Sequence, residues 1–293
     1  MQPTATPKMG KFKTSKEIIK SSWAILNQGK EIMLFPIVST IVSLVALAFF
    51  ISLYFLFATF SMTGLSQVTS DKIGVGPYIG IFVFYLVMFF IVNFFQAGMF
   101  IIVYGRFSGQ NLSFSDGMRG AINNIGKIFS WSLISATVGV ILDMIASRSK
   151  IIGRIVASIL GAAWNIMTYF SLPSLIIGQK SIKESFKESA SMIRKTWGEV
   201  FIVNVGAGLI FGLILLFVLC FCILAVILVP KMPMIITILI LFIILTVIIS
   251  VVSVTLNTIF KLALYVYAST GQVPQGFSSE LIQSAIKTNR AWA

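Results

Sequence analysis

The chain contains no histidine and only two cysteines among its 293 residues. Without histidine there is no imidazole for a catalytic dyad, a proton relay or a typical zinc centre. Cys220 and Cys222 lie two residues apart inside an apolar stretch, so they point to different faces of a helix. We expect them to pack against lipid or protein and to form neither a disulfide nor a metal site.

Acidic residues are also scarce, with 9 Asp and Glu against 22 Lys and Arg, which gives a net charge of +13. Asp143 is the one carboxylate that falls deep inside an apolar stretch. There is no Walker loop, no His-Glu helix motif and no pair of intramembrane acids, so neither hydrolysis nor proton-coupled antiport has an obvious residue set. We therefore expect no enzymatic activity and no cofactor.

Apolar residues dominate what is present: the chain is 57% hydrophobic and only 11% charged. A soluble domain carries about 25% charged residues. Six apolar stretches reach the roughly 20 residues that cross a bilayer. The sequence thus predicts an all-α membrane protein with a flexible cytoplasmic tail over 1–13 and a single six-helix membrane domain over 14–293. The expected spans are 33–60, 77–104, 128–147, 151–177, 200–229 and 234–267, and Pro173 should kink the fourth one turn before itself.

A short segment recurs before every second span. Its core, Ala24–Lys30 (AILNQGK), returns as Ala121–Lys127 (AINNIGK) and more loosely as Met192–Glu199 (MIRKTWGE). Gly-Gln follows each even-numbered span, at 109–110, 178–179 and 271–272, and a phenylalanine comes soon afterwards (Phe114, Phe186 and Phe277). This shared order predicts three repeats of an amphipathic interfacial helix and a transmembrane hairpin, at about 14–108, 113–177 and 181–270, with a last surface helix over 278–289.

Capping boxes are expected to open the three surface helices, at Thr14/Glu17, Ser113/Asp116 and Ser185/Glu188. In the first helix, Ile18, Ile19, Trp23, Ile25 and Leu26 share one face and Lys16, Lys20 and Asn27 the other. This pattern is typical of a helix lying in the membrane interface, and it also fits a helix packed on its own protein. The two interpretations are compatible. The expected interfacial anchors are Trp23, Lys30, Lys127, Arg194, Lys195 and Trp197.

Basic residues predict the orientation of the spans. Most of them lie in the segments that contain the surface helices; on the opposite side are Lys72, Arg148, Lys150, Arg154 and Lys231. Because positive residues stay in the cytoplasm, both termini are expected inside. This orientation accounts for the basic charge without nucleic acid as a partner.

Polar side chains inside the spans are the intramembrane candidates for a site. Gln96, Asn165 and Asn257 lie at matching depths of the even-numbered spans, and Lys261 is one turn beyond Asn257. The amides either bond between helices and hold the bundle together, or surround a polar site near the inner leaflet. Lys261 either adds to that site or extends to the cytoplasmic interface. Asp143 is predicted to pair with Arg154 across a hairpin; the alternative is an Asp exposed to water.

The first repeat, Lys20–Ser39, resembles the N-terminal block of a family of uncharacterised six-helix prokaryotic membrane proteins. The resemblance rests on Trp23, Lys30, Glu31, Phe35, Pro36 and Ser39. It implies a six-helix integral membrane protein of the plasma (inner) membrane of a prokaryote, and no particular activity.

Two functional hypotheses follow. The first is a non-enzymatic protein that uses a basic cytoplasmic collar of surface helices to bind the lipid bilayer through anionic headgroups, or to organise a membrane-protein partner. The second is a small permease or lipid-translocating protein with a polar site between the even-numbered helices.

Overall fold

A computed structural model of the chain describes residues 11–64, 76–149, 151–196, 211–224 and 232–285. Within these ranges the chain is all-helical. Five helices are long and apolar enough to cross a membrane, and a shorter apolar helix, Phe211–Leu224, lies inside the predicted fifth span. Their length and composition indicate a membrane-embedded protein. The five candidate spans are Lys30–Leu56, Ile79–Phe107, Ile125–Ser147, Ile152–Ile176 and Met232–Thr270.

The bounds of these five spans agree with the predicted ones to within a few residues, and both ends of the predicted fifth span, 200–229, lie outside the described residues. Four of the five predicted runs each form one continuous helix. The exception is the predicted fourth span, which forms two helices separated by Thr168–Phe170. The observed helices are α2 (Leu34–Gly64), α3 (Gly76–Phe107), α5 (Ile125–Ser147), α6 (Ile152–Met167), α7 (Ser171–Ile176) and α10 (Met232–Thr270).

Pro173 explains the interruption between α6 and α7. A proline has no N–H to donate to the carbonyl four residues back, and its ring crowds that carbonyl. The last bond of α6 runs from the Thr168 N–H to the Trp164 carbonyl at 2.9 Å, and the helix resumes at Ser171. Pro173 is then the third residue of α7, where no helical donor is needed. The predicted kink one turn before Pro173 is confirmed as this break.

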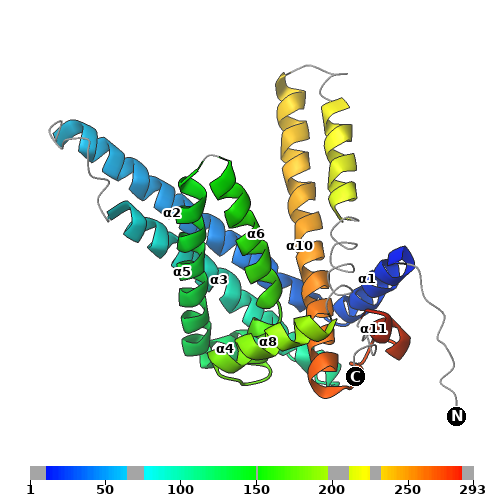
Figure 1. Ribbon diagram of the computed structural model, residues 1–293. Helices are drawn as coiled ribbons and strands as arrows, with labels where there is room; N and C mark the ends of the chain where they lie inside the picture. Colours follow the sequence, from blue (N-terminus) through cyan, green and yellow to red (C-terminus); the bar gives the residue numbers. More distant parts are fainter. Residues whose placement is uncertain (1–10, 65–75, 150, 197–210, 225–231, 286–293) are drawn as a thin grey trace, which may run out of the picture. The chain divides into compact units, whose positions relative to one another are not determined.

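The chain forms two compact units. One contains Ile37–Ile101 and Phe114–Ala190, and its centre is the α5–α6 hairpin, whose two helices lie side by side (Figure 1). Trp131 stacks on Trp164 across this hairpin, with ring centroids 6.2 Å apart. Gly153 lets the helices meet near their turn, since a Cβ there would stand 2.5 Å from the Ile145 carbonyl oxygen.

The other unit contains α1 (Lys11–Gln28), η1 (Lys30–Met33), α10 and α11 (Ser279–Ala285), together with Ile102–Ser113. Here α1 packs against α10, η1 and α11 (Figure 1). Ile25 and Leu26 of α1 are buried, and Phe277 makes an edge-on contact with Phe107 at 6.1 Å. The N-terminal surface helix is therefore packed on its own protein.

The three Gly-Gln pairs all stand where a helix ends, and each supplies one residue in the left-handed region. Gly109 (φ 75°) ends α3 with two bonds, from Gln110 N–H to the Gly105 carbonyl at 2.8 Å and from Gly109 N–H to the Arg106 carbonyl at 3.1 Å. Gly271 (φ 72°) ends α10 with one bond to the Tyr267 carbonyl at 2.8 Å. These are the two common glycine endings of helices. After α7 it is Gln179 (φ 51°), not Gly178, that takes this conformation.

We expect Gly109→Ala to destabilise the protein by about 1 kcal/mol, because an alanine in the left-handed region costs roughly 1–2 kcal/mol. A methyl group at Gly109 would meet nothing closer than 4.0 Å, so the effect comes from the backbone alone. Gly80→Ala is the matched control: Gly80 lies within α3 with nothing within 4 Å, and alanine should raise stability there. Thermal unfolding in detergent tests this, and an unchanged midpoint for Gly109→Ala would contradict it.

Candidate functional site

The three predicted amides lie in different local environments. Gln96 is half-buried in α3, Asn165 is exposed on α6, and Asn257 is half-buried in α10, where it donates to Ser253 Oγ of its own helix at 3.4 Å. No hydrogen bond joins the described side chains of Gln96 and Asn165, which belong to the same unit. A hollow of about 480 Å³ lies at the α5–α6 turn, and its lining of mostly apolar residues includes none of the amides.

The buried amide that does link two helices is Asn93, one turn before Gln96. It donates to Ser132 Oγ of α5 at 3.0 Å, and Ser132 donates to the Ile128 carbonyl at 2.8 Å. Both side chains are buried. This is the helix-bonding role that we considered for the amides, at a residue we had not selected. Choosing Asn93 over Gln96 requires the rotation of α3 against α5, which the sequence alone does not show.

The predicted ion pair between Asp143 and Arg154 is wrong. Both side chains are exposed, and no ion pair joins them. The reason is rotational: buried Gly153 faces α5 at their closest approach, so the next residue, Arg154, points about 100° away from α5. Asp143 therefore follows the alternative of an exposed carboxylate. Lys261 is half-buried in α10.

The described residues contain no group of three or more His, Cys, Asp or Glu side chains placed to hold a metal ion. The remaining candidates are the interfacial anchors. Trp23 is 45% exposed on α1, and Lys30 and Arg194 are exposed. Lys195 lies in α8 (Ile182–Thr196), and Trp197 lies outside the residues that the structure describes.

The surface helices begin at different residues from those predicted in two of three cases. Helix α4 (Phe114–Asn123) starts directly after Ser113, as expected. Helix α1 already begins at Lys11, so Thr14 does not open it, and residues 11–13 of the predicted tail are helical. Helix α8 begins at Ile182, one turn before the predicted box at Ser185.

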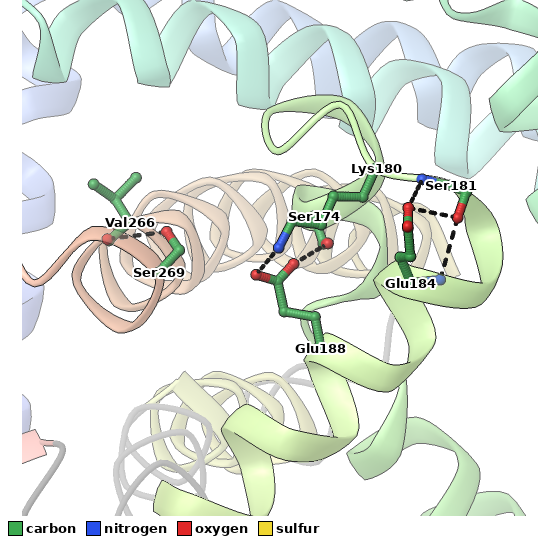
Figure 2. Close-up of polar contacts among 7 residues, drawn as sticks. All are labelled: Ser174, Lys180, Ser181, Glu184, Glu188, Val266 and Ser269. Carbon is green, nitrogen blue, oxygen red and sulfur yellow. Dashed lines mark hydrogen bonds and ion pairs between the residues drawn. The ribbon is translucent and has the colours of Figure 1, made fainter.

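The capping box of α8 is made by Ser181 and Glu184. The Ser181 hydroxyl and backbone N–H donate to Glu184 Oε2 at 2.7 and 3.0 Å, as Figure 2 shows. Ser185 is instead buried inside the helix, with its N–H bonded to the Ser181 carbonyl at 2.8 Å. The sequence repeats Ser-x-Lys-Glu at 181–184 and 185–188. Both copies fit the capping pattern, and the helix begins at the earlier one.

The second copy, at 185–188, does not cap the helix; its Glu188 attaches α8 to α7. Its carboxylate accepts a hydrogen bond from the Ser174 hydroxyl and pairs with Lys180 at 2.5 Å (Figure 2). One residue later, Ser189 Oγ accepts the Phe170 N–H at 2.9 Å, at the break between α6 and α7. Phe186 stacks on Trp164 of α6 with centroids 5.9 Å apart. Helix α8 is thus fixed to the end of the hairpin by charge, hydrogen bonding and aromatic packing.

A further contact joins the start of α5 to the turn that follows α7. Lys127 Nζ, in the first turn of α5, donates to Gln179 Oε1 at 2.8 Å. Gln179 Nε2 is 3.5 Å from Asn124 Oδ1. The Gly-Lys turn and the Gly-Gln turn of this repeat therefore lie against each other, and Lys127 is held in place instead of extending freely.

We predict that Ser181→Ala raises the pKa of Glu184. The hydroxyl and then the backbone N–H of Ser181 stabilise the charged carboxylate and lower the pKa of Glu184 from its ordinary value. With a lowered folded-state pKa, this stabilisation is present above the ordinary pKa of glutamate and is lost as pH falls through the lowered value. Carboxyl ¹³C NMR of glutamate-labelled protein in detergent would measure it. Ser185→Ala is the control, and equal shifts in both variants would contradict this capping assignment.

Comparison with known proteins gives a family and no activity. A family model described as a family of unknown function (DUF6159) matches residues 75–276, which is more than half of the chain. No curated protein and no solved structure matches the chain. The matched range begins after Lys20–Ser39, so the segment that carried the resemblance lies outside it. The expectation of an uncharacterised family is confirmed: the chain belongs to the DUF6159 family, whose function is unknown.

Proposed function

We propose that this protein is a non-enzymatic membrane protein whose basic surface helices bind anionic lipid headgroups or a membrane partner at the cytoplasmic face of a prokaryotic plasma membrane. The observation that carries the proposal is the orientation of the surface helices. Their buried residues are mostly apolar or small, and the basic side chains described on them, Lys16, Lys20, Arg119, Lys183, Lys187 and Arg194, are exposed.

Helix α1 has this division along its length. Ile18, Ile25 and Leu26 are each 2% exposed, whereas Lys16 and Lys20 are exposed and Trp23 stands 45% exposed beside them. Tryptophan is favoured at headgroup depth because its ring is apolar and its N–H is polar. An exposed tryptophan next to lysines therefore fits contact with a lipid surface.

Helix α8 repeats the division with different chemistry. Its buried side consists of Ser185, Ser189, Met192 and Ile193, and the exposed side carries Lys183, Lys187 and Arg194. Helix α4 adds the exposed Arg119. Each Lys or Arg near an anionic leaflet contributes about 1 kcal/mol of attraction. Several such residues held on packed helices would give a preference for anionic lipid without a deep pocket.

We include in the proposal six spans arranged as three repeats, with both termini in the cytoplasm. Two features support it. All three even-numbered segments end in a left-handed residue at a Gly-Gln pair. Where α4 meets α5, the Gly-Lys turn contacts the Gly-Gln turn of the same repeat through Lys127 and Gln179. Under this topology the basic residues of α1, α4 and α8 face the cytoplasmic leaflet.

The alternative, a small permease or lipid-translocating protein, requires the amides of the even-numbered helices to line one polar path. The described contacts favour it less. Asn165 is exposed on α6, Asn257 bonds within its own helix, and Asn93 rather than Gln96 makes the buried link between helices.

We expect the reconstituted protein to enrich phosphatidylglycerol over phosphatidylcholine in its surrounding lipid. The combined change of Lys16, Lys20, Lys183 and Lys187 to Gln should abolish most of this preference, because it removes four cations of about 1 kcal/mol each. Lipid mass spectrometry of nanodiscs with mixed lipids measures the enrichment. The control is Arg148→Gln with Arg154→Gln, which removes exposed charge from the other end of the α5–α6 hairpin. A preference that survives the lysine changes would argue against the proposal.

A further inference from the structure

Arg106, near the end of α3, is a half-buried cation. It lies at the turn around Gly29 that joins α1 to η1, which we call the first elbow of the chain. Its guanidinium lies against Gly29, between α1 and η1: a Cβ on Gly29 would stand 2.4 Å from Nη2 and 2.9 Å from Cζ. Both residues belong to the same compact unit. The arginine therefore sits where the chain turns from the surface helix towards its first candidate span.

The protein offers few hydrogen-bond acceptors to the N–H donors of this guanidinium. Nη2 donates to the Leu112 carbonyl at 3.5 Å, which is long for a hydrogen bond, and Nε is buried without an acceptor. No carboxylate of the described chain is recorded in an ion pair with Arg106. Donors that lose water without gaining an acceptor are costly, so this guanidinium favours a further acceptor.

We propose that Arg106, with Lys30, forms a binding site for a phosphate group at the elbow. A guanidinium can bind two phosphate oxygens through paired N–H donors, and the exposed Lys30 adds a second positive charge next to Gly29. This inference rests on the proposed function, which puts the elbow at headgroup depth, and it names one specific site on the basic surface. A phospholipid headgroup and free phosphate share this chemistry.

Gly29 is part of the site because it leaves room for the arginine. Its backbone is extended (φ −164°), so alanine is allowed there and would act only by pushing the guanidinium aside. Gly126, at the equivalent elbow of the second repeat, has nothing within 4 Å of a Cβ. Gly29→Ala and Gly126→Ala thus form a matched pair, in which only the first disturbs Arg106.

The test is native mass spectrometry of the full chain in detergent, titrated with short-chain phosphatidylglycerol, phosphatidylcholine or inorganic phosphate. We expect phosphatidylglycerol to bind more tightly than phosphatidylcholine. Arg106→Gln should weaken its binding about tenfold, the loss of one charge-assisted contact. Gly29→Ala should weaken it in the same direction, and Gly126→Ala should leave it unchanged. Binding of inorganic phosphate that depends on Arg106, without preference between the two lipids, would support the site with a soluble phosphate as its ligand.

Arg106→Lys, which keeps the charge and loses the paired donors, serves if the glutamine variant does not fold, and size-exclusion profiles check all variants. Equal phosphatidylglycerol binding by wild type and Arg106→Gln, together with loss in the lysine-to-glutamine variant of α1 and α8, would overturn this site and leave the proposed function standing. A wild type that binds no phosphate and does not prefer phosphatidylglycerol would overturn both.

Discussion

The attachment of α8 through Glu188 is the interaction on which the proposed surface depends. An amphipathic helix of this length is marginal on its own in water, so its position must come from packing. Glu188 reaches Ser174 of α7 and Lys180 of the connecting turn, and Phe186 stacks on Trp164 of α6. The break at Thr168–Phe170 also contributes, because it leaves the Phe170 N–H free to donate to Ser189. The break caused by Pro173 therefore also supplies one of the hydrogen bonds by which α8 packs against the hairpin.

This attachment fixes the backbone that carries the basic residues of α8. A lysine on a freely moving segment must be ordered before it can contact a headgroup, whereas a lysine on a docked helix already has a fixed backbone. Of the two acidic residues one turn apart in α8, Glu184 caps the helix and Glu188 fixes it to α7, so both carboxylates are already engaged within the protein. Lys183 and Lys187, each directly before one of these acids in the sequence, remain exposed. In the function we propose, a docked helix with its acids engaged and its lysines exposed presents its positive charge to the membrane surface.

The sequence predicted the parts of the fold that depend on local pattern. Apolar runs located the candidate spans, Pro173 located the break, and the Gly-Gln pairs located three helix ends. It failed where two local solutions were equally good, as with the two Ser-x-Lys-Glu copies of α8, and at α1, which begins before its expected cap. It also failed where rotation between helices decides. Asp143 and Arg154 are close in the chain, yet the contact at Gly153 turns Arg154 away, and the register of α3 against α5 selects Asn93 over Gln96. These outcomes depend on packing, which no short stretch encodes by itself.

Amide hydrogen exchange of the full chain in nanodiscs, comparing Glu188→Gln with Glu184→Gln, tests most directly whether Glu188 positions α8. The two variants remove the same charge one turn apart in the same helix. The account predicts that Glu188→Gln speeds exchange through α7, the turn at 177–181 and α8, because the helix loses its attachment. Glu184→Gln should affect only the first turn of α8. Equal exchange in the two variants, with α8 still protected when Glu188 is changed, would contradict the claim that this contact positions the basic surface.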